Sequence, residues 1–349
     1  MGESDGGVRF RPRVQGDGLD ELYTRALATG GRVDDALALA RRLGATAPVP
    51  GGGDTAHLWQ SLATIAAADV TAARVAEPHL DALAILHQAR GVDLPTIAAG
   101  EHSTWGVFAA EGAGSRLAAT RSGDGWCLSG TKPWCSLAGM LTHALVTATT
   151  SASRRRLFAV DLRHPGVRPG PDAWVARGLV AVPSGPVAFD EVPAVPVGDD
   201  GWYLDRPGFA WGGTGVAAVW WGAAAGIARR LLGAPRRSDR IAELLIGSVD
   251  LALHAGGLAL AAAAAEIDSP HAEGGGERML ALRTRAIVAR GAEDVLRLAG
   301  HALGPAPLAL EDDHARRVAD LTLYLRQHHA ERDEADLGAT LLDARERPW

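Results

Sequence analysis

Apolar and polar positions follow three different spacings along the chain. Over residues 19–90, Ala and Leu recur at the three- and four-residue intervals of amphipathic helices, with one break at residues 48–54. After the break we expect a helix from Asp54 or Thr55 to about Ala68, because Asp and Thr are favoured at helix N-caps. The pattern predicts a helical N-terminal domain over residues 1–103.

The spacing changes to short β-type runs at about Thr104. These runs are separated by Gly, Pro, Asp and Ser, and the segment Ser122 to Gly125 (SGDG) is typical of a hairpin turn. We therefore expect successive antiparallel strands. Short strands with many turns favour a small barrel or sandwich over a parallel sheet, so we predict a middle antiparallel β-barrel domain over residues 104–206.

Helical spacing returns in the last third of the chain and predicts a C-terminal four-helix bundle over residues 207–349. Its long helices are expected at residues 215–232, 238–267, 277–303 and 312–336. The second of these carries Gly256, Gly257 and a run of alanines, so we expect it to pack closely against neighbours or a second subunit. The fold class is an α+β multidomain chain.

Composition excludes several classes of protein. The 349 residues are 47% hydrophobic and 22% charged, which is enough for a substantial core, and a net charge of −6 with interleaved signs argues against nucleic-acid binding. A small molecule is the expected partner. No apolar run approaches the roughly 20 residues of a membrane span. Two cysteines, Cys127 and Cys135, fit a reducing interior, so we expect a soluble, cytoplasmic protein.

The most specific stretch is Val107 to Gly139, which reads VFAAEGAGSRLAATRSGDGWCLSGTKPWCSLAG. It resembles the middle-domain pattern of the acyl-CoA dehydrogenase superfamily: T-E-P-G-x-G-S-D, then a Gly-Asp-Gly turn, then N-G-x-K-x-W-I-T-N. The strings LFAVDL at Leu157, GPVAFDEVPAVPVG at Gly185 and HALGPAPL at His301 are similar to further family segments. The resemblance covers about Leu19 to Leu342 and implies the same order of three domains.

The resemblance implies FAD as cofactor. A flavin needs an apolar wall for its ring, polar backbone groups at the ring edge and anion-binding groups for its tail. The positions that match the family's flavin contacts are Ala109, Ala110, Trp134, Cys135, Ser136, Arg236, Arg237, Leu303 and Gly304. The tight turn at Gly114 and Ser115 is expected to approach the substrate, a phosphate or an acyl thioester.

The chain departs from the family pattern at the catalytic base. Ungapped counting from the glycine turn places the family's glutamate at His328, so His328, His329 and Glu331 are the candidates for a base that removes the α-proton. Imidazole, with an ordinary pKa of about 6.5, suits proton transfer near neutral pH. The family's T-E-P is Ala110-Glu111-Gly112, and its Asp is Arg116. No metal site is expected.

Each of these features also has a purely structural interpretation. Trp134 can be a core aromatic of the barrel, the Gly114 turn a plain hairpin, and the His328 region a polar helix end with internal salt bridges. For residues 154–156, three consecutive arginines, a solvated turn is the preferred interpretation over a phosphate site.

The resemblance implies an FAD-dependent, acyl-CoA dehydrogenase-like oxidoreductase that desaturates an acyl-CoA thioester, with hydride transfer to flavin N5 near Ser136. Its electron acceptor would be an electron-transfer flavoprotein, and its assembly a homodimer or homotetramer. Two alternatives stay open. One is a flavin-dependent monooxygenase of the same fold, motivated by histidine at the glutamate position; the other is a catalytically inactive relative that serves as a subunit or scaffold.

Overall fold

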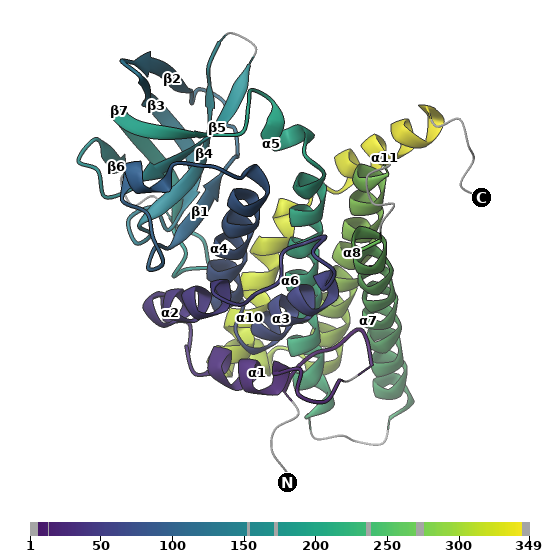
Figure 1. Ribbon diagram of the computed structural model, residues 1–349. Coiled ribbons are helices and arrows are strands. Elements are labelled where there is room, and N and C mark those ends of the chain that lie inside the picture. The colour runs from purple at the N-terminus through teal and green to yellow at the C-terminus, as the bar shows by residue number, and fades with distance from the viewer. Residues whose placement is uncertain are drawn as a thin grey trace.

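The structure, a computed structural model, describes residues 6–12, 14–151, 154–170, 174–234, 239–269 and 276–343. Helices from both ends of the chain lie together in one bundle, and a curved sheet is attached at its side (Figure 1). Helix α4 (Val70–Ala89) lies between the sheet and the other helices. The sheet and the bundle therefore share a boundary along α4.

The N-terminal helices are α1 (Leu19–Leu27), α2 (Val33–Gly44), α3 (Thr55–Ala68) and α4, followed by the short 3-10 helix η1 (Leu94–Ile97). Helix α3 begins and ends where its apolar spacing predicted, and nearly all of its residues are buried. The Asp54 side chain makes no capping hydrogen bond. Instead, Asp268 at the end of a distant helix accepts hydrogen bonds from the backbone N–H groups of Gly53 and Thr55, at 3.1 and 2.9 Å.

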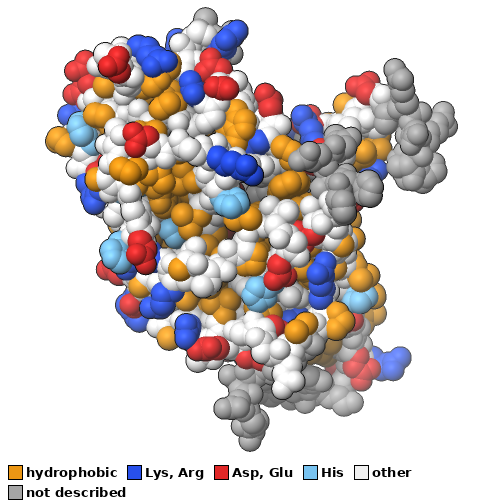
Figure 2. Space-filling view, viewed as in Figure 1, with side chains coloured by type: hydrophobic (Ala, Val, Ile, Leu, Met, Phe, Trp, Pro, Cys, Tyr) orange, Lys and Arg blue, Asp and Glu red, His pale blue; other side chains and the backbone are white. Residues whose placement is uncertain are grey.

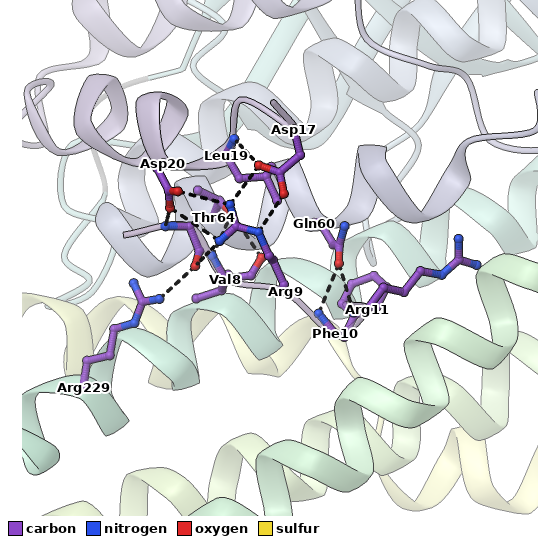
Figure 3. A network of polar contacts seen from close by, with 11 residues as sticks. Val8, Arg9, Phe10, Arg11, Asp17, Leu19, Asp20, Gln60, Thr64 and Arg229 are labelled. Carbon is purple, nitrogen blue, oxygen red and sulfur yellow. Dashed lines mark hydrogen bonds and ion pairs between the residues drawn. The ribbon is translucent and has the colours of Figure 1, made fainter. Parts of the chain in front are cut away.

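The segment before α1 is fixed to α3 by polar contacts (Figure 3). The Val8 N–H donates to Thr64 Oγ1 at 3.1 Å, and the Phe10 N–H donates to Gln60 Oε1 at 3.2 Å. Arg9 pairs with Asp17 at 2.7 Å. These contacts hold the segment against α3 and so cover part of a helix that is apolar almost all round.

Seven strands form the sheet: β1 (Trp105–Phe108), β2 (Leu117–Ser122), β3 (Gly125–Ser136), β4 (His143–Thr149), β5 (Arg155–Asp161), β6 (Val167–Pro169) and β7 (Ser184–Val197). The hairpin predicted at residues 122–125 joins β2 and β3. The ladder β4-β2-β3-β7-β5 returns to β4, so the sheet closes on itself, through a single bridge between Ala118 and Thr149. This closure leaves β1 and β6 outside the ring, each paired with one of its strands.

The expectation of a wholly antiparallel barrel is wrong at two places. Strand β1 pairs with β4 in parallel, and the bridge between β2 and β4 is also parallel. The physical reason is that the β2–β3 hairpin lies between β1 and β4 in the chain. The chain therefore returns to lie beside β1 in the same direction, which simple alternation of neighbouring strands does not anticipate.

The C-terminal helices are α5 (Trp202–Asp205), α6 (Pro207–Leu232), α7 (Arg240–Ile267), α8 (Glu277–Leu303), α9 (Ala306–Leu310), α10 (Asp312–Tyr324), the 3-10 helix η2 (Leu325–Gln327) and α11 (Glu331–Asp343). The expected boundaries at 103/104 and 206/207 fall between η1 and β1 and between α5 and α6. Helix α6 begins eight residues before the expected Gly215, with Pro207 at its first position.

The single helix expected over residues 312–336 is wrong. The chain leaves helical geometry at His328, which has a ψ of 125°, and Ala330 has a left-handed φ of 49°. Tyr324 and Leu325 are the last large buried side chains of this segment. Between Arg326 and Leu337 the sequence offers no large apolar residue that would hold a continuous helix against the bundle.

Helix α7 lies on the outside of the bundle (Figure 1). Its glycines contact the chain's own aromatic residues: a Cβ on Gly256 would lie 3.0 Å from Trp221, and one on Gly257 would lie 3.2 Å from Phe10. The predicted close packing is therefore confirmed on this inner side. Of the described helices, α7 is the one that is long and apolar enough to cross a membrane, by length and composition only, and 22% of its most apolar stretch is buried. Charged side chains of both signs are interspersed over the face in Figure 2.

Candidate functional site

Two adjoining cavities lie where the barrel meets the helices. The barrel-side cavity, of about 560 Å³, is lined by Ala109, Thr147, residues 154–156 and residues 200–204. The helix-side cavity, of about 1030 Å³, is lined by α4, the α5–α6 region, the first turns of α8, and α11. Tyr203 and Leu204 border both cavities. The two spaces therefore meet at the short helix α5.

Two carboxylates of α4 face the helix-side cavity. Glu77 and Asp81 are four residues apart, so they lie on one face of the helix, one turn from each other. The Glu77 side chain is 11% exposed, and Tyr324 donates its hydroxyl hydrogen bond to Glu77 Oε2 at 3.1 Å. Burial raises the pKa of Glu77, although Arg74 and the Tyr324 hydroxyl act in the opposite direction.

The pKa of the second carboxyl, Asp81, is also raised. Burial raises the pKa of Asp81 to about 7, the nearby Glu77 adds to this effect, and Arg206 opposes it. A carboxyl with a pKa close to neutral can take up or release a proton under ordinary conditions, which is a property of many functional sites.

Arg206 and Tyr203 come from the connection between α5 and α6. Both residues are 7% exposed. The guanidinium of Arg206 lies 5.3 Å from the centre of the Tyr203 ring and donates to Gln88 Oε1 at 2.8 Å, while its Nε has no hydrogen-bond partner. Burial lowers the pKa of Arg206 and raises that of Tyr203. This connection thus brings a buried cation and a buried phenol to the cavity wall.

Arg285 of α8 joins the cavity to the broken end of α10. It donates to the backbone carbonyls of Gly213 and, at 3.2 Å, Gln327, and its guanidinium lies 4.8 Å from the centre of the Trp220 ring. These contacts fix the backbone next to His328. Burial lowers the pKa of Arg285, but the surrounding carbonyls and the aromatic face suit a charged guanidinium.

The predicted base candidates lie differently with respect to the cavity. The His328 side chain is 7% exposed, its ring centre lies 6.1 Å from that of Trp220, and its Nδ1 is 3.0 Å from Asp333 Oδ2. Burial and Arg285 lower the pKa of His328, whereas Asp333 opposes them. His329 is 67% exposed, contacts Asp333 at 3.2 Å and lines the cavity. Glu331 is exposed at the start of α11 and does not line either cavity.

The predicted flavin-contacting residues of the barrel are only partly brought together. Ala109 lines the barrel-side cavity, and Ala110 follows it at the surface. Trp134 lies in an irregularity of the β3–β7 ladder, with a left-handed φ of 58° and 60% of its surface exposed. Such a backbone is strained for a bulky residue, and bulges commonly direct a side chain at functional sites.

The neighbours of Trp134 face inward. Cys135 is buried, and burial raises the pKa of its thiol to about 12. The Ser136 hydroxyl is 2.7 Å from that of Ser184, and Arg74 of α4 donates to it at 2.9 Å. Residues 134–136 do not line either cavity. The Ser136 hydroxyl, which the sequence predicted to contact the flavin edge, therefore already accepts a hydrogen bond from Arg74.

The remaining predicted contacts lie elsewhere. Gly114 and Ser115 form the turn before β2, where the Ser115 N–H donates to the Gly112 carbonyl at 3.2 Å. Leu303 and Gly304 end α8, and Gly304 has a left-handed φ of 68°. Arg236 and Arg237 lie outside the described residues.

The sequence did not predict the cavity residues whose pKa values burial shifts. These are Glu77, Asp81, Tyr203, Arg206 and Arg285. A signal for the first two was present, since two carboxylates stand four residues apart in an Ala-rich helix. The arginines carried no such signal, because arginine is frequent throughout this chain.

Comparison with known proteins shows similarity at two levels, a matching middle domain and a shared overall fold. Residues 106–192 match the model of the acyl-CoA dehydrogenase middle domain. No curated protein matches the chain. Among solved structures, KijD3 in complex with FMN and dTDP-3-amino-2,3,6-trideoxy-4-keto-3-methyl-D-glucose is 21% identical, with 97% of this chain and 96% of that chain covered and a TM-score of 0.79.

Two further structures show the same fold. Dibenzothiophene monooxygenase (TdsC) from Paenibacillus sp. A11-2 is 18% identical, with coverage of 95% and 98% and a TM-score of 0.75. Butyryl-CoA dehydrogenase from Megasphaera elsdenii is 15% identical, with coverage of 95% and 100% and a TM-score of 0.75. The order of helices, sheet and helices is therefore the acyl-CoA dehydrogenase fold. Within this fold, the match to the family's middle-domain model covers residues 106–192, about a quarter of the chain.

Proposed function

We propose that the protein is a flavin-dependent oxidoreductase that acts on a small molecule bound in the helix-side cavity. The observation that carries this proposal is the cavity itself, about 1030 Å³, which shares Tyr203 and Leu204 with the cavity lined by residues of the matched middle domain. This volume is at the upper end of the usual range for small-molecule sites, about 300–1000 Å³. Its lining combines apolar side chains with carboxylates and guanidinium groups, as expected where a substrate is both buried and oriented.

The residues present fit a flavin in two respects. The strained, exposed indole of Trp134 offers a flat apolar surface for a ring, and the barrel-side cavity offers the Ala109 backbone and the arginines of residues 154–156 for polar edges and phosphate. The bond between Arg74 and Ser136 must be shared or broken for the serine to contact the ring edge. We keep FAD as the proposed cofactor, and KijD3 and TdsC, whose solved complexes contain FMN, support a flavin in general.

A bound flavin supplies two-electron redox chemistry, either as an oxidant of the substrate or, when reduced, as an activator of dioxygen. We favour the second use, oxygenation, because desaturation needs a base within reach of the α-proton. Of the three predicted base candidates, His328 is enclosed behind Trp220 and Glu331 lies outside the cavities. Oxygenation has no such requirement. The monooxygenase TdsC among the structural neighbours is consistent with this choice.

Acyl-CoA desaturation is the second candidate, and two observations favour it. His329 lines the helix-side cavity and is oriented by Asp333, at 3.2 Å, so it is placed to accept a proton. The arginines of residues 154–156 line the adjoining cavity, where they suit the phosphates of a CoA thioester. In this case electrons would pass to an electron-transfer flavoprotein, as predicted from the resemblance. The predicted homodimer or homotetramer and the cytoplasmic location stay predictions.

The experiment that separates these functions begins with reconstitution of the purified protein with FAD or FMN. We expect oxygen uptake that requires reduced flavin and a small substrate, and no anaerobic bleaching of the flavin by short, long or branched acyl-CoA. Bleaching by an acyl-CoA would establish desaturation in place of oxygenation. Failure to retain either flavin would leave the remaining alternative, an inactive relative that serves as a subunit or scaffold.

A further inference from the structure

The helix-side cavity is richer in carboxylates than in cations. The described carboxylate residues that line it are Glu77, Asp81, Asp205, Glu277, Asp333 and Asp336. The described guanidinium residues are Arg206, Arg278 and Arg285. Arg278 pairs with Asp336 at 2.9 Å, and Arg285 directs its donors to backbone carbonyls. Neither Arg278 nor Arg285 therefore pairs with a carboxylate of α4, although Arg74 of α4 itself pairs with Glu77 at 3.6 Å.

Asp81 has no hydrogen bond and no ion pair with any residue that the structure describes. The charge of Arg206 lowers the pKa of Asp81, but Arg206 donates its hydrogen bond to Gln88 Oε1, at 2.8 Å. On the other side, Asp81 Oδ1 borders α6 so closely that a Cβ built on Gly212 would lie 2.7 Å from it. Asp81 is partly buried at the cavity wall. A partly buried carboxylate without a partner is unfavourable, so its position suggests a partner that enters from the cavity.

Tyr203 supplies an independent indication of a ligand. It is 7% exposed, it borders both cavities, and its hydroxyl makes no hydrogen bond with a described residue. Its ring contacts Phe209 edge to face, with ring centres 5.3 Å apart. A buried phenol normally finds a hydrogen-bond partner. Here the hydroxyl is available to a group in the cavity, and the two aromatic rings form part of the wall.

We propose that Asp81, Glu77 and Tyr203 bind the protonated amino group of a small, otherwise apolar substrate. An ammonium group has three donors, which match two carboxylates and a phenol oxygen. The apolar body of the substrate would lie against Phe209, Val216 and Leu282, which line the same cavity. This substrate class rests on the proposed function, and it places the amine-bearing molecule in the helix-side cavity, separate from the arginines of the barrel-side cavity.

The test is calorimetric titration at pH 8 with benzylamine as the probe. Benzyl alcohol and phenylacetate serve as its neutral and anionic counterparts of similar size. We expect wild-type protein to bind benzylamine and to discriminate against both counterparts. Loss of a charge-assisted hydrogen bond weakens binding about tenfold to a hundredfold, which is the effect expected of Asp81→Asn. Tyr203→Phe removes a neutral hydrogen bond and should weaken binding about twofold to tenfold.

Two further variants keep the test decisive. Gly212→Ala retains every charge but crowds the Asp81 carboxylate, so it should also weaken benzylamine binding; it serves if Asp81→Asn does not fold. Asp294→Asn removes a carboxylate of α8 that is 52% exposed and paired with Arg297, and it should bind like wild type. Equal binding of benzyl alcohol and benzylamine, or wild-type affinity in Asp81→Asn, would overturn the proposal. So would no measurable binding of benzylamine.

The outcome is separable from that of the proposed function. The titration uses protein with and without FAD, and visible absorbance reports flavin binding independently. Selective amine binding in a protein that retains no flavin would support the amine site and contradict the redox function. Flavin retention without amine selectivity would overturn the amine site alone.

Discussion

Replacement of Asp81 by asparagine should raise the stability of the folded protein relative to wild type as the pH increases from 4 to 8. Below and above this range, pH should affect both proteins equally. The folded-state pKa of Asp81 is about 7, about three units above its ordinary value of 3.8. An acid whose pKa is raised by folding favours the folded state fully below pH 3.8. That contribution is lost as the pH rises from 3.8 through 7.

The size of this effect follows from the two pKa values. At 1.36 kcal/mol for each pKa unit, the loss between pH 4 and pH 8 is about 4 kcal/mol. The amide of asparagine has its own cost of burial, but this cost does not change with pH. The difference in free energy of unfolding between variant and wild type should therefore rise by about 4 kcal/mol over this range.

Urea unfolding at intervals from pH 4 to pH 8.5 measures this difference directly. Glu77 is coupled to Asp81, so its ionisation will broaden the transition in wild type. Asp294→Asn, at an exposed position, should follow the wild-type curve. If the stability difference between Asp81→Asn and wild type were the same at pH 4 and pH 8, the assignment of Asp81 as a partly buried, unpaired carboxyl would be refuted.

Three further changes test the close contact between α3 and α6, the buried Lys132–Glu111 ion pair of the barrel, and the proposed contact of Trp134 with a flavin. Gly222→Ala should prevent stable folding, because its Cβ would lie 2.1 Å from the Ala63 carbonyl oxygen where α6 crosses α3, and thermal unfolding measures this. Glu111→Gln should cost about 2–3 kcal/mol in urea unfolding, because the Lys132 ammonium, 2% exposed and 2.9 Å from Glu111, loses its charged partner. Trp134→Ala should reduce flavin retention, read by visible absorbance, with little loss of stability because the indole is 60% exposed.

Each of these changes has a matched control. Gly247→Ala adds a Cβ where nothing lies within 4 Å, so it should stabilise α7 by roughly 0.5–1 kcal/mol. Lys132→Met removes the buried ammonium together with its need for a partner and should be close to neutral. Val180→Ala shortens another exposed apolar side chain, 66% exposed and outside both cavities, and should leave flavin retention unchanged. A stable Gly222→Ala, a neutral Glu111→Gln or full flavin retention in Trp134→Ala would contradict the respective argument.

The parts of the fold that the sequence predicted depend on local patterns. Helix α3 and the Ser122–Gly125 hairpin follow from apolar spacing and turn residues, and both are confirmed. The middle-domain resemblance is likewise confirmed, over residues 106–192. In each case a short stretch of sequence contains all the groups that determine the outcome.

The parts that the sequence did not predict depend on groups far apart in the chain. The cap of α3 is Asp268, more than 200 residues away, and no local pattern indicates it. The loss of helical geometry at His328, just after α10 and η2, depends on where large apolar residues stop contacting the bundle. The raised pKa of Asp81 arises because α6 covers this part of α4 and because Glu77 lies one helical turn away. A carboxylate pair in a helix is visible in the sequence, whereas its burial is not.

The stability gain expected for Asp81→Asn and its expected loss of amine binding have the same origin. A carboxylate held without a partner in a cavity destabilises the folded protein and prepares the site for a cation. The proposed site therefore predicts opposite effects of one substitution on folding and on binding.

The account depends most directly on a flavin bound at the boundary between barrel and helices. Titration of the purified protein with FAD and with FMN, followed by quenching of tryptophan fluorescence and by visible absorbance, measures this binding. We expect saturable binding of at least one flavin, reduced in Trp134→Ala and retained in Val180→Ala. Absence of saturable binding of both flavins to the folded wild-type protein would contradict the central claim.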